Sequence, residues 1–523
     1  MQDVETKLNG LIDSLFCENC VFLDFMKGEV ICNQFECSCS KQIEFSSLLD
    51  FYANLYYHLD NINLANYETF ILFNDIQIDK QIRTEIKDLW MGHLVQYSYD
   101  NNEHEMIHDA TVELIKESLF NSQNNQEIIL KCMNWLYTLD THLEDLKNFL
   151  EGQKDINKTR PIKTNKGVIV FKRQLGLNDY LKTEHKLIPP VDPNYISLKS
   201  NIHNFFLAKE KYAYYDVSYN SLTGGSVERL NRSNIGNLKI GFLPGDFNFE
   251  DYHWNYDNNV DDDFNEEIYF HFDKVMDQTA YYDKVIKAVK EILKQNPDII
   301  ILPELFAPED LQRKILDVVK DEKRRLQNQN QNLNTFLVLP GSFHFFEGGK
   351  IYNRSLISTG NGQILFEVNK MNKFKILRND KNEGALECFK DKEGIEKISF
   401  EKREIQLIET PIGRIGIFIC VDLLNFNIEE ILIDRHVDLI FVMTMTPRPA
   451  SGKFLRKMQE LGERNHSTVI ICNNLGTENI SEDEVKKGAY RIVAYFPGLK
   501  GSYQSNNNYE VVTIEEMVSN KKS

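Results

Sequence analysis

Apolar residues in the N-terminal part of the chain recur three or four positions apart, which is the spacing of an amphipathic helix. The clearest sets are Leu48, Tyr52, Leu55, Tyr56 and Leu59, followed by Leu136, Leu139, Leu143 and Leu146. Polar stretches such as 97–103 separate these runs, and a basic stretch with Pro161 follows at 154–167. The pattern predicts a mainly α-helical N-terminal domain over residues 1–235, with a subdivision near 154–167 and a short strand at 168–171.

The spacing of apolar residues changes after residues 218–236, a stretch rich in Ser, Asn and Gly that marks the predicted domain boundary. Beyond it, short apolar runs alternate with amphipathic runs, which is typical of an α/β layer architecture. The predicted strands are 238–243, 298–302, 335–340, 352–358, 364–367, 405–409, 415–420, 439–443 and 469–473. The predicted helices lie around 285–293 and at 311–319, 428–435 and 453–464. Residues 247–272 have no clear period, and 236–523 as a whole form the second domain.

The amino-acid composition is that of a globular protein without membrane-spanning segments. Hydrophobic residues make up 42% of the chain and charged residues 26%, as in globular proteins, and no apolar run is long enough to cross a bilayer. The polar N-terminus lacks the pattern of a secretory signal, so we expect a soluble, cytoplasmic protein. A net charge of −18 argues against general binding of nucleic acid or of an anionic membrane surface.

Three of the predicted strands end in a reactive side chain: Glu304 in DIIILPEL, Lys370 in ILFEVNK and Cys420 in GRIGIFICVD. Sites assemble at strand ends because the sheet fixes position while the following loops open a cleft. A carboxylate accepts the thiol proton, and a nearby ammonium lowers the thiol pKa and stabilises an oxyanion. Lys373 is an alternative cation, but the spacing from the Gly362 turn favours Lys370. Singly these residues are ordinary, as a helix cap, a solvated lysine and a core cysteine; together they indicate an active site.

These segments resemble the nitrilase superfamily of carbon–nitrogen hydrolases, which includes nitrilases, aliphatic amidases, N-carbamoyl amide hydrolases and the glutamine-hydrolysing domains of NAD synthetases. The resemblance covers about residue 237 to the end and rests on LPEL, YNRSLISTGNGQILFEVNK, TPIGRIGIFICVD, and LIFVMT followed by VIICNNLG, in the family's order. It implies a nitrilase-like αββα sandwich. It also implies a catalytic triad of Glu304, Lys370 and Cys420 that cleaves amide, carbamoyl or nitrile bonds through a thioester or thioimidate, without a required cofactor.

The resemblance points further to residues that bind substrate. The position after the cysteine, often a bulky aromatic residue in relatives, is Val421, which changes the pocket wall, and Asp422 keeps the usual acidic residue and orients its loop. Many relatives carry a second glutamate in the loop after the lysine, and Glu383 and Glu387 are the candidates. Arg448, in TMTPRPAS, lies where relatives contact substrate, although a solvated surface arginine is the ordinary alternative.

Cysteines crowd the N-terminus. Cys17, Cys20, Cys37 and Cys39 form a CxxC followed by a CxC, with Cys32 between them. Four thiolates hold a structural zinc ion in many proteins, which makes this set a candidate zinc site. An apolar run separates the two pairs, and burial of these cysteines in a core is the competing interpretation.

The sequence HEMIH at 104–108 matches the HExxH pattern, in which two histidines one helical turn apart bind zinc. The residues before it are polar and acidic, whereas the helix of a metal site normally packs on an apolar face. We therefore discount a zinc protease.

We expect an amidase-type hydrolase that its N-terminal domain regulates or targets. The alternatives are a catalytically silent nitrilase fold used as a binding or oligomerisation module, and an acyltransferase in which an amine replaces water. Nitrilase-like domains also occur fused to other modules in bacterial defence proteins, and this analogy suggests such a context. The resemblance implies that pairing of two copies through helices 428–435 and 453–464 completes the sandwich. The expected partners are thus a second copy, in a homodimer or larger homo-oligomer, and a small amide or nitrile substrate.

Overall fold

The structure is a computed structural model, and it divides into two compact units, each described here by itself. One unit comprises Met1–Gln174 with Val191–Glu210, and the other comprises Leu175–Pro190 with Lys211–Ser523. The described residues are 22–24, 29–31, 52–53, 55–57, 136, 140, 162–163, 167–171, 177–185, 205–208, 212, 214–222, 227, 229–230, 234–245, 249–257, 267–377, 392–400, 403–475 and 482–520. The α/β unit therefore starts before the boundary expected at residue 236.

In the first unit, two short strands pair antiparallel, β1 (Phe22–Asp24) with β2 (Glu29–Ile31). A three-stranded antiparallel sheet contains β3 (Ile162–Lys163), β4 (Val168–Phe171) and β5 (Phe205–Ala208). The strand predicted at 168–171 is thus present. The cysteine cluster, the HExxH motif and most of the predicted helices lie outside the described residues, so the mainly helical character of this part stays a prediction.

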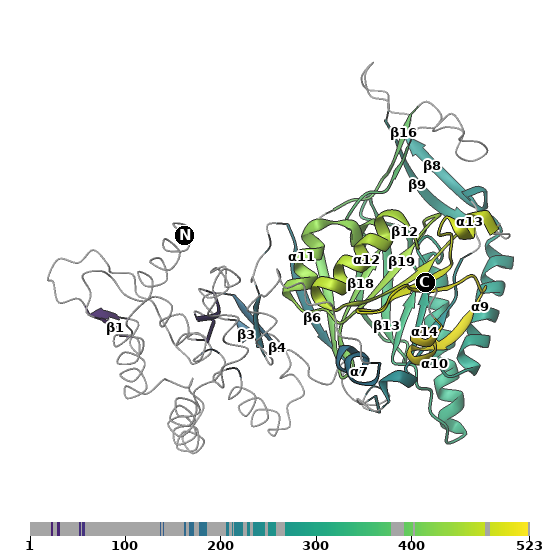
Figure 1. The fold of residues 1–523 in the computed structure, drawn as a ribbon. Coiled ribbons are helices and arrows are strands. Elements are labelled where there is room, and N and C mark those ends of the chain that lie inside the picture. The colour runs from purple at the N-terminus through teal and green to yellow at the C-terminus, as the bar shows by residue number, and fades with distance from the viewer. Residues whose placement is uncertain are drawn as a thin grey trace. The chain divides into compact units, whose positions relative to one another are not determined.

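The first large sheet contains β7 (Lys239–Phe242), β10 (Ile299–Leu302), β11 (Leu337–Pro340), β12 (Phe343–Glu347), β13 (Lys350–Thr359), β14 (Ile364–Asn369) and β23 (Glu510–Thr513). Its order is β12-β13-β11-β10-β7-β23, with β14 also paired to β13. The central strands β7, β10 and β11 run parallel. Two long helices, α9 (Gln278–Lys294) and α10 (Glu309–Asn328), lie along one face of this sheet (Figure 1).

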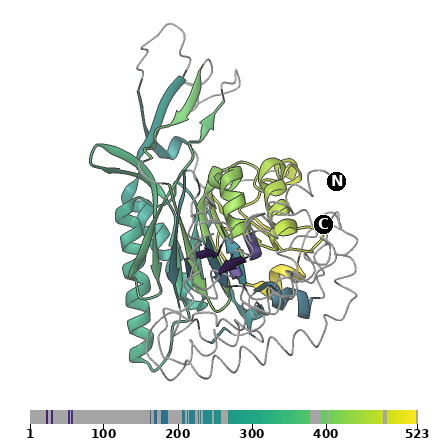
Figure 2. The same ribbon diagram turned by 90° about the vertical axis from the view of Figure 1, so that its left-hand side faces the viewer.

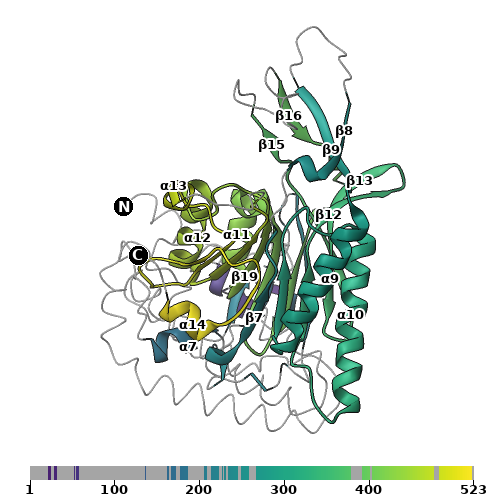
Figure 3. The ribbon, with the colours of Figure 1, turned by 90° about the vertical axis from the view of Figure 1, so that its right-hand side faces the viewer.

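The second large sheet contains β6 (Asp216–Ser221), β17 (Glu404–Thr410), β18 (Gly413–Ile419), β19 (Leu439–Thr444), β20 (Thr468–Asn473), β21 (Ile492–Tyr495) and β22 (Tyr503–Ser505). Its order is β22-β21-β20-β19-β18-β17-β6. The helices α11 (Phe426–Asp434) and α12 (Gly452–Asn465) cover its outer face (Figure 3). Strand β6 lies before residue 236 and pairs in parallel with β17, which explains why the unit begins earlier than expected.

The two large sheets pack face to face within one chain. Along β10, Ile299 and Ile301 join the apolar core that contains the second sheet, whereas Ile300 and Leu302 join the core formed with α9 and α10. Alternate side chains of a strand point to opposite faces, so this division places the second sheet on one side of β10 and the helices on the other. Figure 3 shows the resulting order of helices, sheet, sheet and helices. The expectation that dimerisation completes the four layers is wrong, because a single chain already supplies all of them.

A smaller four-stranded sheet projects from the sandwich (Figure 2). Its order is β15-β16-β9-β8, with bounds β8 (Tyr252–Asp257), β9 (Glu267–Val275), β15 (Lys375–Ile376) and β16 (Glu393–Glu396). Aromatic side chains pack across the β8–β9 pair; the rings of Trp254 and Phe272 are 4.3 Å apart. Strand β8 lies within the stretch 247–272, and β9 overlaps it. The sequence of this stretch shows no alternation of apolar and polar residues, because aromatic residues occupy both faces of β9.

Shorter elements complete the α/β unit. They are α7 (Leu177–Glu184), α13 (Glu482–Lys486), α14 (Ile514–Ser519) and the 3-10 turns η4 (Ile235–Asn237), η5 (Phe249–Asp251) and η7 (Cys420–Leu424). The helix α14 begins with a capping box in which Thr513 and Glu516 bond each other's backbone N–H groups. None of the described helices is long and apolar enough to cross a membrane.

Candidate active site

The three residues predicted to form the triad lie at strand ends. Glu304 follows β10 by two residues, Lys370 directly follows β14, and Cys420 directly follows β18. Strand β18 belongs to the second large sheet and the other two strands to the first. The site therefore forms where strands of both sheets end, and all three residues are at most 3% exposed.

Cys420 occupies a sharp turn between a strand and a 3-10 turn. Its φ is +50°, in the left-handed region that residues other than glycine rarely adopt. Such a conformation costs on the order of 1 kcal/mol and persists only where surrounding structure imposes it. Strain of this kind clusters at functional sites, and here it sets the direction in which the thiol leaves the backbone.

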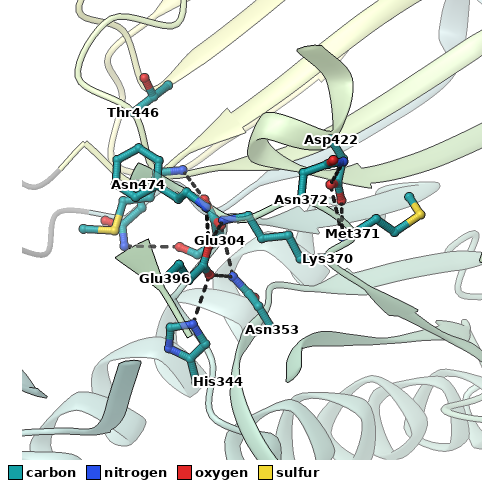
Figure 4. A network of polar contacts seen from close by, with 12 residues as sticks. Glu304, His344, Asn353, Lys370, Met371, Asn372, Glu396, Asp422, Thr446 and Asn474 are labelled. Atoms are coloured by element: carbon teal, nitrogen blue, oxygen red, sulfur yellow. Dashed lines mark hydrogen bonds and ion pairs between the residues drawn. The ribbon is translucent and has the colours of Figure 1, made fainter. Parts of the chain in front are cut away.

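Lys370 is held between two buried carboxylates (Figure 4). Its Nζ donates to Glu304 Oε1 at 2.7 Å and to Glu396 Oε2 at 2.6 Å. Asn353 Nδ2, on β13, lies 3.1 Å from Oε1 of each glutamate and bridges them. The backbone N–H of Met445 donates to Glu304 Oε2 at 2.9 Å. These contacts fix the Glu304 carboxylate beside the Cys420 thiol, whose pKa it raises.

Glu396 is the site residue that sequence reasoning missed. It is the last residue of β16, which pairs in parallel with β9 and places Glu396 opposite Phe270. The candidates for a second glutamate, Glu383 and Glu387, lie outside the described residues. No local signal singles out Glu396, because its strand reads EGIE and Lys397 follows, so its neighbours in sequence are mostly charged.

The structure separates the remaining predicted residues. Lys373, the alternative cation, is exposed and lies over the ring of Tyr269 at 5.3 Å, so Lys370 is the lysine in contact with Glu304. Val421 is partly buried against the apolar core next to the cysteine. Arg448 is exposed on the loop after β19, three residues beyond the Met445 that bonds Glu304. Arg448 thus lies on the same loop as a site contact but outside the buried network.

Asp422 joins the two loops that carry the lysine and the cysteine. Its carboxylate accepts the backbone N–H of Met371 at 3.0 Å and Asn372 Nδ2 at 2.8 Å. Burial raises the pKa of Asp422 to about 7, although Asn372 and the Met371 N–H oppose the shift. Because Met371 is the residue after Lys370, this contact fixes the position of the lysine relative to Cys420. The role in orienting the loop, predicted for Asp422, fits this geometry.

The electrostatics of the site follow from burial and from its one ammonium. Burial raises the pKa of Glu304, with Lys370 opposing it, and burial together with Glu304 raises the pKa of the Cys420 thiol. Burial alone would lower the pKa of Lys370, but Glu304 and Glu396 hold it above its usual range. Burial alone would raise the pKa of Glu396, but Lys370 and His344 hold it below its usual range. Lys370 lowers the pKa of the Cys420 thiol, as expected from the sequence, but burial and Glu304 outweigh it, so the resting thiol keeps its proton.

This arrangement has the parts that acyl chemistry needs. A thiol lies beside a carboxylate of raised pKa, which accepts a proton more readily than an ordinary glutamate. Two N–H donors of the ammonium bond carboxylates, and the third bonds no described residue. That third donor is available to an oxyanion that forms at a carbon bonded to Cys420.

Comparison with known proteins identifies one family. The sequence model of the carbon–nitrogen hydrolase family matches residues 267–495. Comparison with curated protein sequences found no match.

Solved structures offer similar chains at low identity. An amidase from Nesterenkonia sp. is 12% identical, with 55% of this chain and 93% of that chain covered and a TM-score of 0.34. Nit3 from Saccharomyces cerevisiae, a member of branch 10 of the nitrilase superfamily, is 14% identical, with 54% and 92% covered and a TM-score of 0.34. A glutamine-dependent NAD+ synthetase from Acinetobacter baumannii is 18% identical, with 53% and 44% covered and a TM-score of 0.31.

Proposed function

We propose, from the premise that residues 267–495 form a carbon–nitrogen hydrolase domain, that this chain hydrolyses a non-peptide carbon–nitrogen bond in an amide, carbamoyl compound or nitrile. The observation that carries the proposal is the contact of one carboxylate, Glu304, with both the Cys420 thiol and the Lys370 ammonium. Burial of ionisable groups is costly unless they are paired, and here a thiol, a carboxylate and an ammonium are buried together at strand ends.

Acylation begins with proton transfer from the Cys420 thiol to Glu304 as sulfur attacks the substrate carbon. With an amide, the carbonyl oxygen becomes an oxyanion that the third N–H of Lys370 stabilises. The carbon–nitrogen bond then breaks, and Glu304 returns the proton to the departing ammonia or amine. The product of this half-reaction is a thioester on Cys420. With a nitrile, sulfur adds to the carbon–nitrogen triple bond, the nitrogen takes the proton from Glu304, and the product is a thioimidate. Addition of water to the thioimidate then releases ammonia and leaves the thioester.

Deacylation reverses the roles. Glu304 removes a proton from water, the hydroxyl attacks the thioester carbon, and Lys370 again stabilises the oxyanion. The carbon–sulfur bond breaks, the acid leaves, and Cys420 recovers its proton from Glu304. The resting state described above, with a protonated thiol and a carboxylate of raised pKa, is the state this cycle returns to.

The test combines a substrate screen with mass spectrometry of the intact protein. Purified protein is incubated with amides, nitriles and carbamoyl compounds while released ammonia is measured. Cys420→Ala removes the nucleophile and is expected to lower turnover by at least about a thousandfold. Glu304→Gln keeps the shape but cannot activate water, so any acyl group that forms on Cys420 accumulates and adds its mass.

Cys472→Ala is the matched control, since Cys472 is also a buried thiol of the sandwich and lies near the carbonyl of Ile301 rather than Glu304. It is expected to keep wild-type turnover. Unchanged turnover in Cys420→Ala contradicts the proposal. Adding a primary amine tests acyl transfer, because a transferase yields a substituted amide in place of the acid.

A further inference from the structure

His344 lies beside the site on the second residue of β12, and its side chain is fully buried. Its Nδ1 accepts the backbone N–H of Phe272 at 2.8 Å, and its Nε2 lies 3.0 Å from Glu396 Oε1. A backbone N–H is always a donor, so Nδ1 carries no proton and the neutral ring has its proton on Nε2. His344 therefore donates to Glu396. The ring also stacks on Phe272, with centroids 5.6 Å apart and planes 16° from parallel.

The Glu396 carboxylate needs such donors to keep its place. Its Oε2 accepts from Lys370 Nζ at 2.6 Å and from the backbone N–H of Phe374 at 2.9 Å. Its Oε1 accepts from His344 and from Asn353 Nδ2, and that amide nitrogen is shared with Glu304. His344 is thus the one side-chain donor in this described network that serves Glu396 alone.

We propose that His344 is a positioning residue of the reaction, which holds Glu396 so that Lys370 stays between the two carboxylates with one N–H directed at the oxyanion. The inference rests on the proposed function and deepens it. His344 acts through Glu396 and touches no reacting atom. Without the hydrogen bond from His344, the Glu396 carboxylate turns out of its present orientation, and the Lys370 ammonium moves with it. The oxyanion then loses an N–H donor of fixed direction.

The placement of His344 explains why one side chain has this influence. It belongs to β12 of the first large sheet, whereas its two partners belong to β9 and β16 of the projecting sheet. Glu396 reaches the site only because β16 pairs with β9, and His344 bonds both strands. The side chain therefore ties the projecting sheet to the strand ends where Glu304 and Lys370 lie.

Two substitutions separate the two bonds of the ring. In His344→Asn, the side-chain oxygen occupies the place of Nδ1 and still accepts the Phe272 N–H, but nothing reaches Glu396. In His344→Gln, the longer side chain places an N–H near the position of Nε2 and keeps the donor to Glu396. His185→Phe is the control for loss of a histidine–glutamate contact away from the site, since His185 Nε2 lies 2.9 Å from Glu515 Oε2 and this pair is partly exposed.

We expect His344→Asn to lower kcat about tenfold to a hundredfold, the effect of losing one hydrogen bond to a charged group, with KM nearly unchanged. His344→Gln recovers most of that loss, and His185→Phe keeps wild-type kcat. The acid limb of the pH–rate profile moves to higher pH in His344→Asn, because Glu396 protonates more easily with Lys370, Asn353 and Phe374 as its remaining donors. Equal losses in Asn and Gln variants with an unchanged pH profile indicate packing alone and overturn the proposal, as does wild-type kcat in His344→Asn.

A second readout keeps this test separate from that of the proposed function. The rate at which iodoacetamide alkylates Cys420 is followed against pH by mass spectrometry, without any substrate. If the wild-type protein hydrolyses no amide or nitrile, the proposed function fails, but the positioning of the charged cluster is still measured. An alkylation profile of His344→Asn that departs from wild type at acidic pH, while His344→Gln follows wild type, supports the role of His344; identical profiles for all three proteins refute it.

Discussion

Replacing Lys370 with Met removes the charge that the two buried glutamates share while keeping most of the side-chain volume. In the wild-type protein the ammonium lies 2.7 Å from Glu304 and 2.6 Å from Glu396, with all three side chains nearly inaccessible to solvent. The substitution leaves two carboxylates bridged by one amide nitrogen of Asn353. Both carboxylates cannot stay charged in so small a buried space, and one of them takes up a proton.

The size of the effect follows from the burial of the pair. Removing one partner of a buried ion pair destabilises a protein by about 3–5 kcal/mol, because the other partner is left desolvated and uncompensated. At about 2–4 °C per kcal/mol, the melting temperature of the α/β unit falls by about 6–20 °C. Lys373→Met, three residues along and exposed, is the matched control. A surface substitution of this kind changes stability by less than about 0.5 kcal/mol.

The sign of the pH dependence gives a sharper check. Lys370 and His344 hold the pKa of Glu396 below its usual range, so Glu396 stabilises the wild-type fold above the unfolded pKa and loses this contribution as pH falls. In Lys370→Met the remaining carboxylates have raised pKa values, so they favour the fold at low pH and lose this contribution as pH rises. The variant is therefore further below wild type at pH 8 than at pH 5.

Calorimetric melting of the full chain at pH 5 and pH 8 measures these differences for wild type, Lys370→Met and Lys373→Met. Lys370→Met combined with Glu396→Gln is expected to recover part of the lost stability, since only one carboxylate then remains. If Lys370→Met has the same melting temperature as Lys373→Met at both pH values, the reasoning is refuted. It would mean that the cluster has no net electrostatic importance for the fold.

Three further results are expected. Asp422→Asn is expected to flatten the pH dependence of stability. Because the pKa of Asp422 is raised in the fold, this residue stabilises the fold below about pH 4, and the contribution falls by about 1.4 kcal/mol per pH unit up to about pH 7. An unchanged pH dependence by calorimetry contradicts this. A homodimer that pairs through α11 and α12 stays a prediction of the family resemblance, although pairing is not needed to complete the four layers; a monomer at micromolar concentration by light scattering counts against it. If the N-terminal cysteines bind zinc, metal analysis finds about one zinc per chain, and Cys17→Ser with Cys20→Ser removes it; normally folded protein without metal favours core cysteines instead.

In the α/β unit, the pattern of apolar residues along the sequence was sufficient to predict each strand that is buried on both faces. The runs around Ile300, Ile417 and Phe441 are continuously apolar, and each is a central strand of the structure. Burial of a central strand leaves its mark in the strand's own residues, so such strands are visible in sequence. The reactive residues Glu304 and Cys420 were visible for the same reason, since each interrupts or ends such a run.

Only the tertiary structure decided which other groups complete the site. Spacing from the Gly362 turn favoured Lys370 over Lys373, but only the packing after β14 shows which of the two side chains is buried. Glu396 and His344 enter the site because β16 pairs with β9 and β9 approaches β12, and such long-range pairing leaves no local period. The resting protonation of Cys420 was likewise hidden, because desolvation by the whole surrounding core outweighs the neighbouring ammonium. Sequence thus determined which strands are buried and which residues end them, while packing of distant strands decided which charges meet there.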